Sequence, residues 1–200
     1  MGGWAEIVEQ IRADNVSGAT ELCLKAAEAV EAWASAARPE GALRELASLC
    51  AALVEAKPEM APILNLANFV LLRAERCGRP EEVPREAAEA AREFARRAKE
   101  NTRRAGSNAA RLLPEGARVL THSSSAAVLD ALREAKGKVA EVLCTESRPM
   151  LEGVSLARRL ASEGLKATVV ADALAPFLVR RVDTVLIGAD CVRAEGVVNK

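Results

Sequence analysis

The stretch Arg118-Val-Leu-Thr-His-Ser-Ser-Ser125 passes directly from residues of strand character into a polar cluster. Short, nearly continuous β-branched runs of this kind are typical of buried parallel strands. The same change recurs in three later segments: Val139–Cys144 runs into Thr145–Arg148, Ala167–Ala171 into Asp172, and Thr184–Ile187 into Gly188–Asp190. Helical stretches over residues 126–136, 154–163 and 173–181 separate the runs. The alternation therefore predicts a doubly wound, Rossmann-like α/β unit.

The polar clusters all follow the carboxyl ends of the predicted strands, where ligands bind in doubly wound sheets. The cluster Thr121–Ser125 precedes a helix that begins near Ala126, so its hydroxyls and free backbone N–H groups suit a phosphate. The alternative is an ordinary serine N-cap. A hydrolase pair of His122, the sole histidine, with Ser123 is disfavoured, because neighbours in a strand point to opposite faces.

Other residues at the strand ends have two interpretations each. Asp190 and, with less support, Asp172 are placed to act as acid, base or hydroxyl anchor, or to cap the next segment. Arg148 either reaches a phosphate or pairs with Glu146. Cys144 and Cys191 fit inert packing better than an activated thiolate.

Residues 1–108 have apolar positions at three- and four-residue spacing and predict a helical N-terminal domain. The expected helices cover residues 4–13, 18–36, 41–55, 61–77 and 84–104. Turn residues at Gly106-Ser107-Asn108 place the domain boundary there, so residues 109–200 form the α/β domain. Val16-Ser-Gly-Ala19 before a helix and Lys57-Pro58 between two helices suit a ligand or a simple turn.

Composition narrows the class of protein. The chain has 200 residues, with 28 Lys and Arg against 28 Asp and Glu, and the resulting zero net charge argues against direct nucleic-acid binding. Five cysteines without a C-x-x-C pair favour a reduced cytoplasmic setting over a disulfide or zinc framework. We expect no metal and no cofactor. No apolar stretch is long enough to span a membrane, and a signal peptide is not evident, so we expect a soluble protein.

Several motifs taken together resemble the initiation factor 2B-like family. They are Thr121–Ser125, Thr145-Glu-Ser-Arg-Pro149 with Leu151-Glu-Gly153, Gly188-Ala-Asp190, Gly196 with Asn199-Lys200, and, in the helical half, Val16–Ala19, Lys57-Pro58 and Asn65-Leu-Ala67. This family includes regulatory subunits of initiation factor 2B, their archaeal homologues, ribose-1,5-bisphosphate isomerase and methylthioribose-1-phosphate isomerase. The resemblance implies that the Rossmann-like domain is C-terminally truncated here, because family members continue beyond Asn-Lys.

The resemblance also implies roles for individual residues. Ser123 stands where the isomerases have a proton-shuttling cysteine, and Asp190 matches their acid–base aspartate. The remaining matched positions bind substrate or phosphate in the isomerases; here they are Ser17, Gly18, Ala19, Lys57, Ser124, Ser125, Glu152, Asn199 and Lys200. Ser17 replaces an arginine of the phosphate loop, Lys57 another arginine, and Glu152 a glutamine.

These replacements favour binding over turnover. A serine hydroxyl is several pKa units less acidic than a thiol, so Ser123 is a poor proton carrier near neutral pH. The resemblance therefore implies a translation initiation factor 2B-like protein that binds a phosphorylated small molecule, a sugar phosphate or a nucleotide. Initiation factor 2 is the implied partner, and the family implies a homo-oligomer assembled through the α/β domain. The alternative is a ribose-1,5-bisphosphate isomerase-like enzyme, in which Asp190 serves as acid and base.

Overall fold

The computed structural model describes residues 3–199, which separate into two compact units. One unit extends up to Lys99 and includes Asp190–Val198, and the other contains Glu100–Ala189 with Asn199. The boundary between them falls within one helix, α5 (Val83–Leu112).

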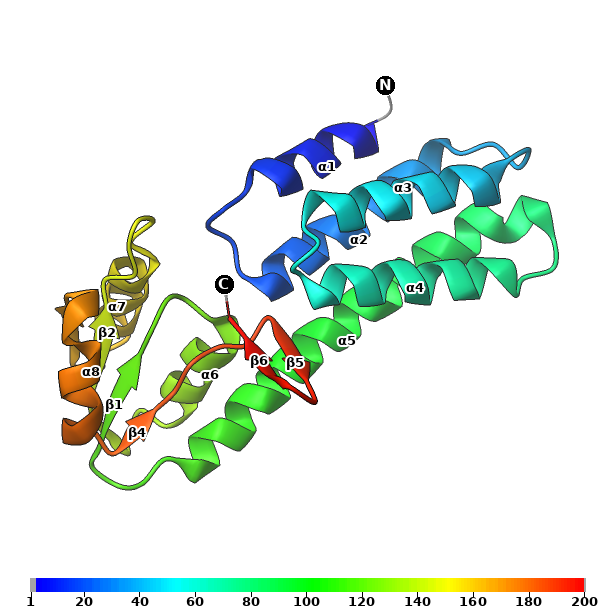
Figure 1. Cartoon of the computed structure of the whole chain (residues 1–200). Helices are drawn as coiled ribbons and strands as arrows, with labels where there is room; N and C mark the ends of the chain where they lie inside the picture. Colours follow the sequence, from blue (N-terminus) through cyan, green and yellow to red (C-terminus); the bar gives the residue numbers. More distant parts are fainter. Residues whose placement is uncertain (1–2, 200) are drawn as a thin grey trace. The chain divides into compact units, whose positions relative to one another are not determined.

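The first unit is helical (Figure 1). It contains α1 (Gly3–Ala13), α2 (Ala19–Ala36), α3 (Ala42–Ala56), α4 (Ala61–Glu75), the short 3-10 helix η1 (Pro80–Glu82) and the first half of α5. Pro62 is tolerated in the first turn of α4, where no helical hydrogen bond is lost. Gly41 precedes α3 with a φ of 78°, a conformation that glycine adopts without strain.

Large aliphatic side chains form the core of the helical unit. Leu22, Leu46, Leu53, Ile63 and Leu66 are completely buried. α5 contributes mainly alanines to this core. Because alanine is small, the backbone of α5 approaches its neighbours closely.

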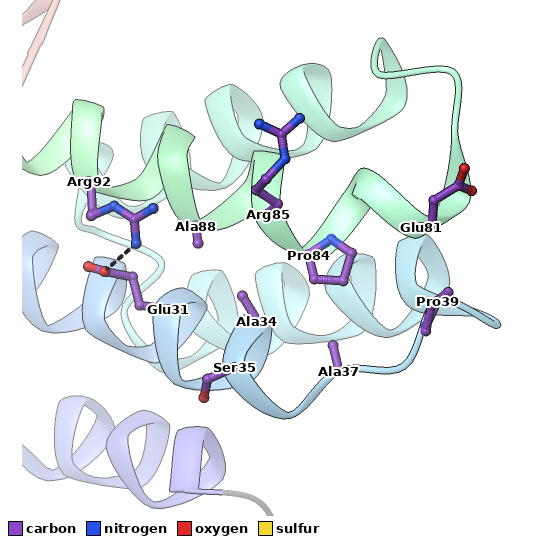
Figure 2. Close-up of a pocket in the computed structure, with 10 residues that line it drawn as sticks. All are labelled: Glu31, Ala34, Ser35, Ala37, Pro39, Glu81, Pro84, Arg85, Ala88 and Arg92. Atoms are coloured by element: carbon purple, nitrogen blue, oxygen red, sulfur yellow. Dashed lines mark hydrogen bonds and ion pairs between the residues drawn. The ribbon is translucent and has the colours of Figure 1, made fainter.

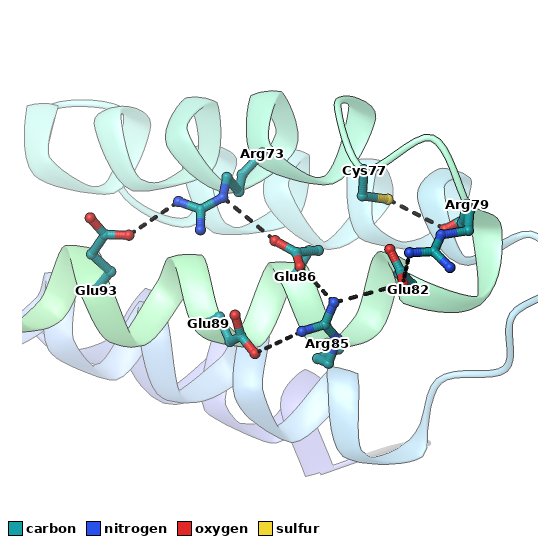
Figure 3. Close-up of polar contacts among 8 residues, drawn as sticks. All are labelled: Arg73, Cys77, Arg79, Glu82, Arg85, Glu86, Glu89 and Glu93. Carbon is teal, nitrogen blue, oxygen red and sulfur yellow. Dashed lines mark hydrogen bonds and ion pairs between the residues drawn. The ribbon is translucent and has the colours of Figure 1, made fainter.

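Ion pairs join α4 and α5 at the surface (Figure 3). Arg73 of α4 contacts Glu86 at 3.5 Å and Glu93 at 3.2 Å on α5. Arg85 contacts Glu89 at 3.3 Å on the same helix. Such exposed pairs contribute about 0.2–1 kcal/mol each, so they orient the helices more than they stabilise them.

The strands β5 (Cys191–Arg193) and β6 (Gly196–Val198) form a two-stranded antiparallel hairpin. Its contacts group it with the helical unit.

The second unit has a four-stranded parallel sheet. Its strands are β1 (Ala117–Thr121), β2 (Val139–Thr145), β3 (Ala167–Val170) and β4 (Thr184–Val185), in the order β3-β2-β1-β4. The helices α6 (Ala126–Glu134) and α7 (Glu152–Ser162) follow β1 and β2, and η2 (Asp172–Leu174), α8 (Ala175–Leu178) and η3 (Val179–Arg181) follow β3. A helical region followed by a parallel, Rossmann-like sheet confirms the predicted fold class.

Two local predictions were wrong. Gly106-Ser107-Asn108 is helical within α5, and Gly106 allows close contact with α6: a Cβ at this position would lie 2.9 Å from Asp130 Cβ. Residues 173–181 are helical as predicted, in consecutive 3-10 and α turns. β3 and β4 are not fully buried, because they are the two edges of the sheet; Val169 and Val185 are exposed.

Among residues 3–199, no helix has both the length and the apolar character needed to cross a membrane.

Candidate functional site

A carboxylate fixes the loop between α1 and α2. Oδ1 of Asp14 accepts hydrogen bonds from the backbone N–H of Val16 at 3.0 Å and of Ser17 at 2.8 Å, and Oδ2 accepts one from Lys25 Nζ at 2.7 Å. Burial alone would raise the pKa of Asp14, but these hydrogen bonds, with that of Lys25 foremost, hold its pKa well below the ordinary value. The loop therefore presents Ser17 in a fixed conformation before α2.

The predicted cation Lys57 lies beside this loop. Lys57 follows the last turn of α3, is only 6% exposed and donates from Nζ to Oδ1 of Asn15 at 3.1 Å. Gly18 is the N-cap of α2, and its end has no side-chain cap. The first turn of α2 has the positive end of the helix dipole, which favours a negatively charged acceptor. The structure thus brings Lys57 together with the loop that ends in Ser17-Gly18-Ala19.

In the α/β unit, the predicted serine cluster lies at the switch point of the sheet. The order β3-β2-β1-β4 places this point between β1 and β4, where ligands bind in such folds. The segments that follow these strands touch: a Cβ at Gly188 would lie 2.7 Å from Cβ of Ser125. Oγ of Ser125 accepts a hydrogen bond from the N–H of Val128 at 3.4 Å. Ser125 is therefore the N-cap of α6, the alternative that the sequence left open.

A hydrogen-bond network joins the loops after β1 and β2. Nδ1 of His122 lies 2.6 Å from Oγ1 of Thr145. The hydroxyl of Ser147 accepts a hydrogen bond from the N–H of Ser123 at 2.8 Å and donates one to the carbonyl of Thr145 at 3.2 Å. Ser147 is buried and central to the network, although the sequence did not single it out. The Ser–His pair of Ser123 with His122 is not formed, since His122 contacts Thr145 instead.

The carboxylate of Asp172 anchors the loop after β2. It accepts hydrogen bonds from the backbone N–H of Ser147 at 2.8 Å and of Arg148 at 2.9 Å. The hydrogen bond from Arg148 is the main reason that the pKa of Asp172 lies below its ordinary value. The side chain of Arg148 pairs with Glu146 at 2.9 Å and is mostly exposed. Asp172 thus has a clear structural role.

Three residues of these loops have left-handed backbones that are unusual outside glycine. The φ angles are 61° at Ser123, 62° at Ser147 and 59° at Leu151. Each costs about 1–2 kcal/mol relative to the common conformations. Such strain persists only where the surrounding contacts fix the backbone. Surrounding contacts therefore hold the loops after β1 and β2 in place.

The other predicted residues have different settings. Glu152 begins α7 and is half-buried. Asp190 precedes the hairpin, and its N–H donates to the carbonyl of Val198 at 2.9 Å. Asn199 is half-buried, and Lys200 lies outside the described residues.

Two buried groups bear on the chemistry near the sheet. Burial raises the pKa of the Cys144 thiol to about 11, so this cysteine is not an activated nucleophile. The hydroxyl of Thr121, at the end of β1, is buried and has no hydrogen-bond partner among the described residues. An unpartnered buried hydroxyl costs about 1–3 kcal/mol.

A hollow of about 570 Å³ lies elsewhere, between α2 and the start of α5 in the helical unit (Figure 2). Small residues such as Ala34 and Ala88 line it. Arg92 and Glu31 also line it and form an ion pair at 3.0 Å. No predicted ligand-binding residue lines this hollow.

The profile of the initiation factor 2 subunit family, IF-2B, matches residues 15–200. The chain belongs to this family. The predicted resemblance is thereby confirmed.

Individual IF-2B proteins resemble the chain over nearly its whole length. It is 37% identical to a translation initiation factor eIF-2B subunit 2-like protein of Pyrococcus abyssi, covering 98% of the chain and 69% of that protein. It is 30% identical to ribose 1,5-bisphosphate isomerase of Archaeoglobus fulgidus, covering 98% of the chain and 63% of the isomerase. The chain thus spans about two thirds of these relatives.

Solved structures agree with the fold. The crystal structure of translation initiation factor eIF-2B from Pyrococcus horikoshii matches 96% of the chain and 68% of its own, with a TM-score of 0.88 and 31% identity. The tetrameric eIF2B-beta2-delta2 complex of C. thermophilum shares the fold, with a TM-score of 0.76 at 19% identity over 94% of the chain and 66% of its own.

Proposed function

We propose that this IF-2B family protein binds a phosphorylated small molecule, a sugar phosphate or a nucleotide, and acts by ligand-dependent regulation in translation initiation. The observation that carries the proposal is Lys57. An ammonium group has three N–H donors. Lys57 is buried, with only 6% of its surface exposed. Among the described residues it has one hydrogen-bond acceptor, Asn15, and no carboxylate partner.

A buried cation without a counter-charge is costly, and a phosphate offsets that cost. The N-terminus of α2 beside Lys57 adds the positive end of a helix dipole. Both features favour an anion of high charge density. Residues 17–19 and Lys57 are therefore our proposed phosphate-binding residues in the helical unit.

In the α/β unit we propose that Ser124, Ser125 and the start of α6 are ligand-binding residues. The switch point, the strained Ser123 backbone and the unpartnered Thr121 hydroxyl support this assignment. We assign Glu152, Asn199 and Lys200 to ligand binding on family resemblance alone.

Binding without turnover is favoured by the residue at position 123. The backbone N–H of Ser123 donates a hydrogen bond to the hydroxyl of Ser147. Among the described residues, no side-chain base is hydrogen-bonded to the hydroxyl of Ser123. The hydroxyl is therefore not activated as a proton carrier.

The alternative function is sugar-phosphate isomerisation, and the 30% identity to ribose 1,5-bisphosphate isomerase favours it. In that case Asp190 acts as acid and base, and Ser123 or a water replaces the thiol.

A thermal-shift screen of AMP, GMP, ribose-1,5-bisphosphate and methylthioribose-1-phosphate tests the proposal. We expect one ligand to raise the melting temperature of the wild type, and the rise to be lost in Lys57→Met. The control Arg44→Met removes a surface cation from α3 and is expected to retain the shift. No shift with any of the four ligands contradicts the proposal.

Turnover and partnership need separate measurements. If the stabilising ligand is converted to a ketose by the wild type, the isomerase alternative is correct. Should only Ser123→Cys convert it, the wild type is a binding protein. For the proposed cytoplasmic partner, a pull-down with initiation factor 2 at low salt is expected to retain the protein, and sedimentation is expected to detect a homo-oligomer. If initiation factor 2 does not retain the protein at low salt, the proposed partner is wrong.

A further inference from the structure

Ser147 uses every polar group that it has. Its N–H donates to Asp172 at 2.8 Å, its carbonyl accepts from the N–H of Leu151 at 2.8 Å, and its hydroxyl joins Ser123 to Thr145. Only 3% of its surface is exposed. With a φ of 62°, this position would suit glycine better than serine on backbone grounds alone. The side chain therefore has a role that offsets the backbone strain.

That role is directed at Ser123. The hydroxyl of Ser147 is the hydrogen-bond acceptor for the N–H of Ser123, whose own φ is 61°. Because β1 ends at Thr121, this N–H has left the strand ladder and precedes the first turn of α6. The hydroxyl of Ser147, on the neighbouring loop, thus sets the orientation of the peptide group that precedes Ser124 and Ser125.

The hydrogen bond between the Ser147 hydroxyl and the Ser123 N–H, which we call the clamp, is itself supported from a third loop. Asp172, after β3, holds the N–H of Ser147 and of Arg148 with its two carboxylate oxygens. The loops after β1, β2 and β3 are thereby joined in one line, Ser123 to Ser147 to Asp172. A loop fixed in this way loses less conformational entropy when its N–H groups and hydroxyls bind an anion.

We propose that Ser147 is a positioning residue, which holds the loop Ser123–Ser125 in its ligand-binding conformation through the N–H of Ser123. The proposal rests on the ligand-binding function proposed above. Ser147 does not contact the ligand in this scheme. It acts through Ser123, and Asp172 keeps Ser147 in place.

The variant Ser147→Gly separates this role from a structural one. Glycine relieves the left-handed strain but removes the hydroxyl. A residue that only forms the turn would therefore give an equally or more stable protein with unchanged binding. The matched control is Leu151→Gly, which relieves a φ of 59° in the same loop and leaves the contact to Ser123 intact.

Two readouts on the full chain test the proposal. We expect hydrogen exchange at the Ser123 amide to accelerate at least tenfold in Ser147→Gly and to stay unchanged in Leu151→Gly. The affinity for ribose-1,5-bisphosphate or AMP, whichever stabilises the wild type, is expected to fall at least tenfold in Ser147→Gly alone. Leu151→Gly should melt at or above the wild-type temperature, whereas Ser147→Gly, which also loses the two hydrogen bonds of the hydroxyl, should melt below it.

The outcomes are distinguishable. Wild-type exchange at Ser123 together with wild-type affinity in Ser147→Gly overturns the positioning role. Faster exchange with unchanged affinity shows that Ser147 holds the loop but that the ligand does not need it, which also overturns the proposal. If the wild type binds none of the four phosphorylated ligands, the proposed function fails and the binding role of Ser147 fails with it. Exchange at Ser123 then still decides whether the clamp exists.

Discussion

Replacing Gly153 by alanine should disrupt the α/β unit at the point where α7 begins. A Cβ at Gly153 would lie 1.7 Å from the carbonyl oxygen of Thr145, whereas real Cβ contacts are essentially never under 3.0 Å. The start of α7 and the end of β2 must therefore separate by at least 1.3 Å. Backbone is on both sides of this contact, so rotation of a side chain cannot relieve it.

The expected cost follows from the groups that move. Overpacking typically costs about 1–3 kcal/mol, and the hydrogen bond from Ser147 to the carbonyl of Thr145 adds about 1 kcal/mol. We therefore expect Gly153→Ala to lower the free energy of unfolding of this unit by about 3 kcal/mol, or roughly a hundredfold in its opening equilibrium. The control is Gly137→Ala, where a Cβ meets nothing within 4 Å; we expect a change within about 0.5 kcal/mol.

Amide hydrogen exchange along Val139–Thr145 is the suitable assay, because both tryptophans, Trp4 and Trp33, are in the helical unit and do not report on β2. Exchange of the β2 amides should accelerate about a hundredfold in Gly153→Ala, in proportion to the loss of opening free energy. Equal exchange rates in Gly153→Ala and Gly137→Ala would refute the steric argument.

Three further predictions concern individual contacts. Gly188→Ala should lower the unfolding free energy of the α/β unit by about 1–3 kcal/mol in denaturant titration followed by circular dichroism, because its Cβ would be 2.7 Å from Ser125; an unchanged midpoint would show that the loop moves freely. Lys57→Met should change stability by less than about 1 kcal/mol while abolishing phosphate-ligand binding by calorimetry, since it removes a buried charge that has no carboxylate partner among the described residues; equal affinity would exclude Lys57 from the site. The depressed pKa of Asp14 stabilises the fold above its unfolded pKa, so tryptophan-monitored stability should fall as pH drops below about 4, and Asp14→Asn should flatten that dependence; parallel curves would contradict it.

The sequence was sufficient to predict local patterns. The four strand–polar repeats gave four parallel strands, because buried parallel strands have a distinctive composition. Spacing also located α1 to α4 to within about two residues, whereas α5, predicted to end at residue 104, continues to Leu112. Where the prediction failed, a tertiary contact decided the outcome: Gly106 is a turn former by composition, yet it allows α5 to pack on α6.

The candidate site was less accessible to sequence reasoning. The cluster Thr121–Ser125 was identified because it is contiguous. Ser147 was missed because its importance depends on partners 24 and 25 residues away in the chain, Ser123 and Asp172. The available signal was the tripeptide Glu146-Ser-Arg148 at a strand end, but sequence does not reveal which N–H groups a serine hydroxyl meets. The contact of Lys57 with Asn15, 42 residues apart, was inaccessible for the same reason.

In both units, an aspartate fixes the candidate ligand-binding loop by accepting hydrogen bonds from backbone N–H groups. In the helical unit, Asp14 accepts hydrogen bonds from two consecutive backbone N–H groups just before Ser17-Gly18-Ala19. In the α/β unit, Asp172 does the same for Ser147 and Arg148, and Ser147 in turn holds Ser123. Hydrogen bonds lower the pKa of each carboxylate, chiefly that from Lys25 for Asp14 and that from the N–H of Arg148 for Asp172, so each remains charged and its loop fixed across the physiological range. Neither aspartate is among the proposed ligand contacts. Because these aspartates fix the loops, the other N–H groups and hydroxyls of the loops can bind the proposed anion. The residues proposed to bind the ligand therefore differ from the residues that position the loops.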